Sequence, residues 1–198
     1  MGAAAQVTLD QAMDLAQQYH ATGKLLLADR TLQDILKSVP DYPPALHMLG
    51  VVYYQRGNLP EALNLIGRAV EQEQDNFLFN GNYGVMLSES GHKEEAIKHF
   101  NLSTDQNPDY ADGYSNKANT LWELGQFAEA EEAARRALEI KPDYPDATLN
   151  LGNALQSQGQ LDEAIACWQK TVEVTPDFDK AWSNLGNALR EKGRVSEA

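Results

Sequence analysis

The chain has 198 residues, and its 29 acidic against 16 basic side chains give a formal net charge of −13 at neutral pH. A field of that sign repels nucleic-acid phosphates and anionic lipid headgroups, so we expect neither nucleic acid nor a membrane as partner. The single cysteine, Cys167, cannot form a disulfide within the chain. No apolar run has the length of a membrane span or a signal peptide, and these features together favour a cytoplasmic protein.

Glycines recur along the chain at a constant interval. A first series consists of Gly23, Gly57, Gly91, Gly125, Gly159 and Gly193, and a second series contains Gly50, Gly84, Gly152 and Gly186. Alanines from Ala28 to Ala198 and prolines from Pro40 to Pro176 follow the same period. Successive members of the first series are 34 residues apart. A fixed period of this length is typical of stacked repeats, so the glycines are explained without a catalytic loop.

In chain order, the period divides a single domain over residues 1–198 into six segments: 9–42, 43–76, 77–110, 111–144, 145–178 and a partial sixth, 179–198. Within the fifth segment, residues 151–155 and 161–172 each carry an apolar stripe with helical spacing. Gly159 fits the turn between the two helices, and Pro176 ends the second one. Each segment is therefore predicted to form a helix–turn–helix unit.

The motifs within these segments resemble the tetratricopeptide repeat family, whose pattern is W-x2-L-G-x2-Y, then A-x3-F, then P. The string Trp182-Ser-Asn-Leu-Gly-Asn-Ala-Leu189 matches the first half, and Ala96-x3-Phe100 matches the second. The resemblance implies an all-α fold, namely a right-handed superhelical solenoid with five complete repeats and a partial sixth. It also implies that the first helices line a concave groove in which ligands bind.

Asparagines recur on the first helices in two phases of the repeat. Asn82, Asn116, Asn150 and Asn184 share one phase, and Asn119, Asn153 and Asn187 share another, three residues later. A carboxamide offers one acceptor and two donors, which match the N–H and C=O of a peptide unit. The pattern predicts a ladder that holds an extended peptide by its backbone, and it is similar to the repeat arm of O-linked N-acetylglucosamine transferases. The alternative is that these amides bond between adjacent repeats.

Aromatic and charged residues on the same helices refine this expectation. Trp122, Tyr54 and His20 fall one helical turn beyond the ladder and are candidates to stack on a ligand, although Trp122 could instead pack on the neighbouring repeat. Acidic residues in the middle repeats argue against a clamp for a terminal carboxylate and favour a neutral or basic peptide: Glu89, Asp112, Glu123 and Asp146. Replacing Asn116 and Asn150 by Ala is expected to weaken binding without changing the melting temperature.

The leading interpretation is a non-enzymatic protein-interaction scaffold that uses no metal or cofactor, because the four histidines lack metal-ligand spacing. One alternative is the substrate-recruiting arm of a larger glycosyltransferase- or sulfotransferase-like enzyme. Another is self-assembly into a homo-oligomer through the uncapped C-terminal repeat, whose second helix would begin near the end of the sequence. The missing helix would expose Trp182, Leu185 and Leu189, although the phase of the repeat assigns Trp168 and Trp182 to the core.

Overall fold

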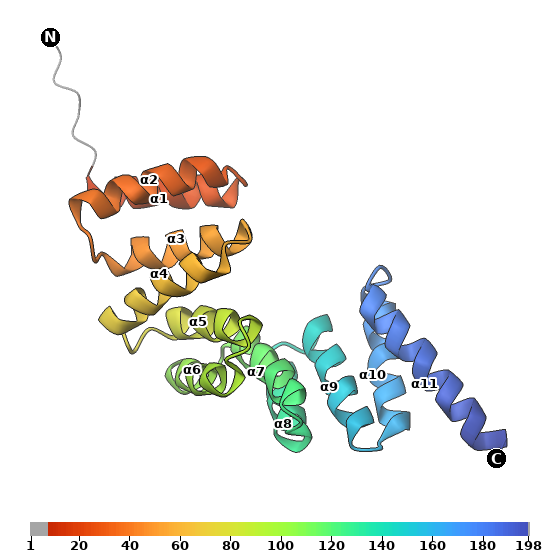
Figure 1. Ribbon diagram of the computed structural model, residues 1–198. Coiled ribbons are helices and arrows are strands. Elements are labelled where there is room, and N and C mark those ends of the chain that lie inside the picture. Colours follow the sequence, from red (N-terminus) through yellow and green to blue (C-terminus); the bar gives the residue numbers. More distant parts are fainter. Residues whose placement is uncertain (1–7, 198) are drawn as a thin grey trace, which may run out of the picture. The chain divides into compact units, whose positions relative to one another are not determined.

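Helices begin at the positions that the repeat period predicts (Figure 1). The computed structural model describes the backbone of residues 8–197 and the side chains of residues 8–193, so Ala198 of the alanine series lies outside the described residues. The first helices are α1 (Leu9–Ala21), α3 (Pro43–Gln55), α5 (Phe77–Glu89), α7 (Ala111–Glu123), α9 (Pro145–Ser157) and α11 (Asp179–Glu197). The second helices are α2 (Leu25–Ser38), α4 (Leu59–Gln72), α6 (Lys93–Gln106), α8 (Phe127–Ile140) and α10 (Leu161–Val174). Both sets recur with the period of the glycine series, which confirms the all-α repeat fold.

The turns inside the repeats depend on glycine. Gly159 joins α9 to α10 with a φ of 80°, a left-handed conformation that costs glycine little. The turn expected at Gly193 is not formed, because this residue lies inside α11. No described helix packs back on α11 after Gly193. Among the described residues, nothing therefore compensates for breaking the hydrogen bonds of α11 at this point.

The chain folds into two compact units, with the boundary between His92 and Lys93. In unit 1, α1 pairs with α2 and α3 with α4, and each pair packs on the first helix that follows it. In unit 2, α6 packs on α7, the pairs α7–α8 and α9–α10 stack on each other, and α10 packs on α11. A single domain over residues 1–198 stays a prediction. None of the described helices combines the length and apolar character needed to cross a membrane.

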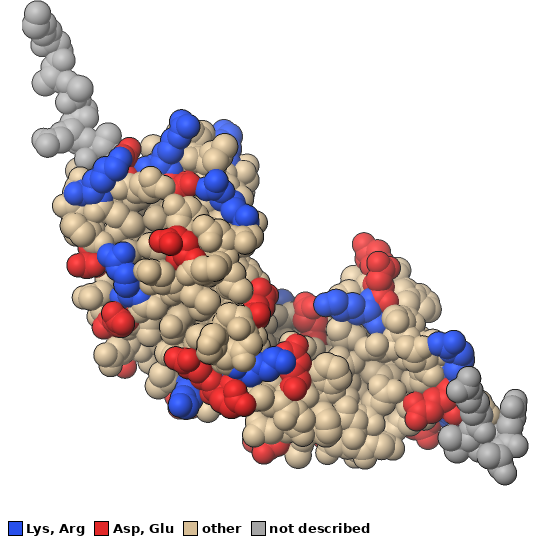
Figure 2. All heavy atoms as spheres, in the orientation of Figure 1, with Lys and Arg blue, Asp and Glu red and all other residues tan. Residues whose placement is uncertain are grey.

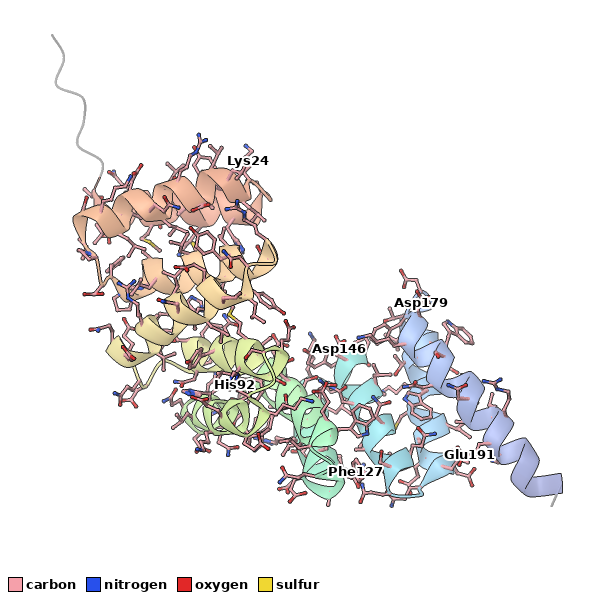
Figure 3. All side chains as sticks on the ribbon, in the orientation of Figure 1. Lys24, His92, Phe127, Asp146, Asp179 and Glu191 are labelled. Carbon is pink, nitrogen blue, oxygen red and sulfur yellow. The ribbon has the colours of Figure 1, made fainter. Side chains whose placement is uncertain are left out.

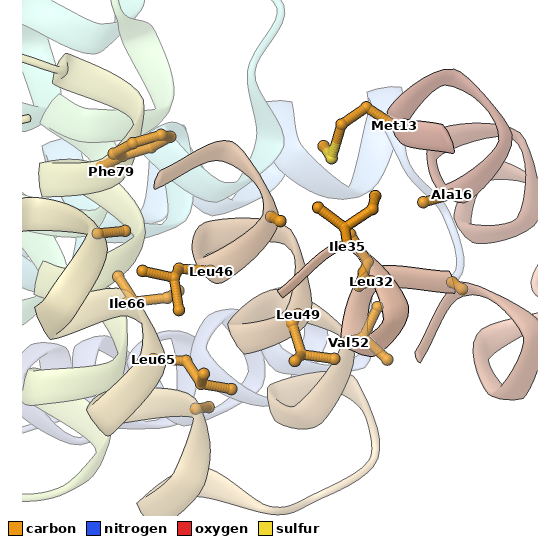
Figure 4. Close-up of a cluster of buried hydrophobic side chains, with 14 of the residues drawn as sticks. Met13, Ala16, Leu32, Ile35, Leu46, Leu49, Val52, Leu65, Ile66 and Phe79 are labelled. Carbon is orange, nitrogen blue, oxygen red and sulfur yellow. The ribbon is translucent and has the colours of Figure 1, made fainter. Parts of the chain in front are cut away.

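Each unit has its own hydrophobic core. In unit 1, Leu32, Leu46 and Ile66 are fully buried between the two helix pairs (Figure 4). In unit 2, the fully buried side chain of Trp168 lies over Gly152, where an added Cβ would be 2.6 Å from its Nε1 atom. The prediction that Trp168 belongs to the core is confirmed. Glycine at this position lets α9 and α10 approach closely enough for the indole to fit between them.

The last helix corrects two expectations. Leu185, predicted to be exposed, is buried in the core of unit 2 with 6% of its surface accessible. Its side of α11 faces the preceding repeat, which is present. Trp182, assigned to the core by its phase, is instead 51% exposed, because no described helix packs over that side of α11. Leu189 is 47% exposed, as the sequence predicted.

Candidate functional site

A groove of about 720 Å³ on unit 2 is lined by α7, α9 and α11, the first helices of three successive repeats. Asp146, one of the residues that line the groove, lies at the N-terminal end of α9 (Figure 3). The lining residues are Ser115, Asn116, Asn119, Trp122, Glu123, Tyr144, Asp146, Leu149, Asn150, Asn153, Gln156, Lys180, Ser183 and Asn184. The structure therefore gathers five of the seven ladder asparagines and Trp122 in one place.

The lining also contains residues that were not singled out from the sequence. Ser115, Leu149 and Ser183 share one phase of the repeat, each exactly one period after the last. That shared phase is a signal that could have identified them, because equivalent residues on equivalent helices face the same side. Tyr144, which immediately precedes α9, could have been identified in the same way, because the sequence Pro-Asp-aromatic recurs with the period at 40–42, 108–110, 142–144 and 176–178.

Asn150 bonds to the preceding repeat. Its Nδ2 atom donates to the backbone oxygen of Ser115 at 3.0 Å and to the hydroxyl of Ser115 at 3.3 Å. In unit 1, Nδ2 of Asn82 donates to Nε2 of His47 at 2.8 Å. Because Asn82 and Asn150 are two repeats apart, as are His47 and Ser115, both units contain a bond between equivalent positions, with a ring nitrogen as acceptor in one and oxygens of Ser115 in the other. Asn82 and Asn150 therefore each join adjacent first helices.

Asn184 has a different partner, and Leu149 stands where Ser115 stands one repeat earlier. Nδ2 of Asn184 donates to Oδ1 of Asn153 at 2.7 Å, whereas a leucine at the Ser115 position offers a backbone oxygen and no side-chain acceptor. Asn153 thereby uses its carbonyl oxygen, and its two N–H donors are left for a ligand. Two ladder residues from adjacent repeats thus form one pair inside the groove.

The remaining ladder residues are less constrained. The side chain of Asn116 makes no hydrogen bond with another residue that the structure describes. Asn119 donates to the carboxylate of Glu123 at 3.1 Å within α7, which leaves its carbonyl oxygen unused. Asn187 accepts from Arg190 on α11 and does not line the groove. Among the described groove residues, Asn116, Asn119 and Asn153 are therefore the ladder residues whose amides are not used in a donated bond to a neighbouring repeat, and they retain hydrogen-bonding capacity to offer a ligand.

The aromatic candidates bond between repeats through their polar tips. The indole Nε1 of Trp122 donates to the hydroxyl of Ser157 at 2.9 Å, while the half-buried ring lines the groove. The Tyr54 hydroxyl donates to the Glu89 carboxylate, and burial together with this bond raises the pKa of Tyr54 to about 12. His20 makes the equivalent bond to Gln55, at 3.0 Å. Because Tyr54 and His20 belong to unit 1, the structure does not place them in this groove.

The charged residues of the groove are Glu123, Asp146 and Lys180. Glu123 is compensated by Lys93, whose Nζ lies 3.0 Å from it. Burial, followed by a hydrogen bond to Asp112, raises the pKa of the Tyr144 hydroxyl above its usual range. Acidic and basic side chains are interspersed over much of the face shown in Figure 2, whereas basic side chains gather over α1 and α2. Among the described residues, no three His, Cys, Asp or Glu side chains gather as metal ligands would.

A family model described as tetratricopeptide repeat matches residues 19–81 and 121–189, and a second model of that description matches residues 84–145. No curated protein matches the sequence. Among solved structures, MamA is 24% identical with a TM-score of 0.72, over 87% of this chain and 94% of that one. YrrB, a TPR protein with an unusual peptide-binding site, is 18% identical with a TM-score of 0.73, over 89% and 91%. TTC0263, a thermophilic TPR protein in Thermus thermophilus, is 24% identical with a TM-score of 0.69, over 92% and 99%. At these identities, the likeness shows the fold alone.

Proposed function

Because the chain belongs to the tetratricopeptide repeat family, we propose that it is a protein-interaction scaffold whose unit 2 groove binds an extended peptide segment. Proteins of this family are generally non-catalytic and bind protein or peptide partners, which supports such a role. The observation that carries the proposal is the gathering of five asparagines and one tryptophan in a single groove.

Three asparagines do the binding in this proposal. Asn116 and Asn119 on α7, and Asn153 on α9, retain donors or acceptors that can pair with a peptide backbone. Asn150 instead holds the two helices at their spacing. The ring of Trp122 stacks on a ligand side chain, since its bond to Ser157 engages its N–H and leaves its faces unused.

The expected affinity is modest. Each hydrogen bond contributes on the order of 1 kcal/mol net, and immobilising a flexible peptide costs several kcal/mol. Three carboxamides, with up to two bonds each, and one stacked ring supply about 4–7 kcal/mol before that cost is subtracted. A dissociation constant of 1 μM needs about 8 kcal/mol net, so these contacts alone predict binding weaker than micromolar. Asp146 has no ion-pair partner among the described residues. Lys180 on α11 is the only basic residue among the described residues that line the groove. This balance favours a neutral or basic peptide.

The test uses a displayed library of random peptides selected on the complete chain. Selected peptides are measured by calorimetry against the wild type and against the double variant Asn116→Ala/Asn119→Ala. We expect a loss of affinity on the order of tenfold or more from the missing backbone bonds. Asn187→Ala is the matched control, because this residue has the phase of Asn119 but lies outside the groove. Equal binding by the double variant and the wild type would refute the ladder.

A further inference from the structure

One face of α11 is left open and carries three aligned residues of alternating size. Trp182, Gly186 and Leu189 are spaced by four and three residues, so they lie on one side of the helix. Trp182 and Leu189 are each about half exposed, and no other atom lies within 4 Å of the position that a Cβ on Gly186 would take. Asp179 and Glu191 mark the stretch of α11 that contains this face (Figure 3).

The α9–α10 pair shows what covers such a glycine. Gly152 is the residue equivalent to Gly186 in the preceding repeat, and it lies within the identical string Asn-Leu-Gly-Asn-Ala-Leu. It is covered by the indole of Trp168, which comes from a helix running in the opposite direction. The tryptophan on one helix is therefore a knob, and the glycine on the antiparallel first helix provides the hole that the knob fills. Gly152 and Trp168 together leave no room for a Cβ.

The face of α11 holds both halves of this pair, with Trp182 one turn before Gly186. We propose that it pairs with α11 of a second copy of the chain, antiparallel and related by a two-fold axis. In that arrangement, Trp182 of each copy lies over Gly186 of the other, so both tryptophan rings are packed and both glycines are covered. The surface is its own complement, which is the requirement for a symmetric dimer interface.

Charges at the ends of the face agree with this register. With Trp182 opposite Gly186, the level of Arg190 on one helix falls within a residue of Asp179 on the other. Both residues are exposed, and they lie on the flank of the same face. Two ion pairs, one at each end, would therefore form across the two-fold axis.

The dimer should be weak and should respond to salt in a defined direction. One helix face per copy is smaller than a standard stable interface, so association should be visible at high concentration alone. Each chain carries a net charge of −13, and the resulting repulsion opposes pairing. Added salt screens this repulsion and also the two ion pairs, but exposed ion pairs contribute little, so the dimer should become stronger as the salt concentration rises.

Sedimentation equilibrium of the complete chain over a wide concentration range tests the proposal. The wild type should pass from monomer to dimer and no further, with more dimer in high salt. Gly186→Leu fills the hole from a position where an added Cβ has no side chain and no atom of another described helix within 4 Å, and it should abolish the dimer. Trp182→Ala, which removes the knob, should do the same. A cooperative melting transition shows for each variant that it is folded.

Leu102→Ala is the matched control, because Leu102 is a comparably exposed leucine on α6 and should leave the dimer intact. A chain that stays monomeric at every concentration and salt condition would overturn the proposal. So would a dimer that survives Gly186→Leu, one that Leu102→Ala weakens equally, or an assembly larger than two copies.

Discussion

The close approach of α9 and α10 at Gly152 makes one substitution especially informative. In Gly152→Ala, the new methyl group would lie 2.6 Å from Nε1 and 2.9 Å from Cε2 of Trp168. These distances are well inside van der Waals contact, so the ring or the helix must move. The ring is fully buried and its Nε1 has no acceptor among the described residues, so packing alone determines its position. A rigid ring in a filled core cannot move aside at low cost.

Gly186→Ala is the matched comparison, in the same six-residue string on α11. Nothing lies within 4 Å of its Cβ position, so the substitution gains the helix propensity of alanine, about 1 kcal/mol. Gly152→Ala gains the same propensity but adds an overpacking cost of roughly 1–3 kcal/mol or slightly more for so short a contact. We therefore expect Gly152→Ala to lose about 0–2 kcal/mol and Gly186→Ala to gain about 1 kcal/mol, a difference of about 1–3 kcal/mol between the two.

Urea denaturation at dilute protein concentration, followed by circular dichroism, measures both free energies of unfolding. Fluorescence from Trp168 provides a probe of the α9–α10 core, since a repeat protein can lose one region before another. If Gly152→Ala were as stable as Gly186→Ala, the packing argument would be wrong. Equal stability would mean that the indole accommodates a methyl group without cost. The glycine series that contains Gly152 and Gly186 would then not reflect close packing between helices.

Two further predictions concern buried polar groups. Asn150→Ala removes the bonds to Ser115 and should lower the free energy of unfolding by about 1–2 kcal/mol in urea titrations, whereas Asn116→Ala should leave it unchanged. This replaces the expectation that both substitutions are neutral for melting. Burial lowers the pKa of His47 to about 4, so the unfolded chain binds a proton below pH 6.5 that the folded chain does not. Stability should therefore fall by about 3 kcal/mol between pH 6.5 and pH 4, and pH-dependent denaturation of His47→Gln should show a smaller slope if this histidine is the cause.

The sequence by itself was sufficient for the fold, since the signals that start and stop these helices act over a few residues. Gly159 needs its left-handed conformation wherever the repeat lies, and Pro145 favours the first turn of α9 regardless of what packs on it. The constant period then predicts every helix start from one well-understood repeat. Gly193 is the exception, because its turn also needs a second helix to pack against.

What the ladder residues do was decided by the tertiary structure. Asn150 and Asn184 occupy the same place in identical strings, yet one bonds to Ser115 and the other to Asn153. Their partners come from residues 35 and 31 positions away, so no pattern within one repeat distinguishes them. Likewise, Gly152 is covered and Gly186 is open because α10 packs on one and no described helix packs on the other. Local sequence specifies helices through short-range contacts, whereas the availability of a side chain depends on which neighbour the stack brings to it.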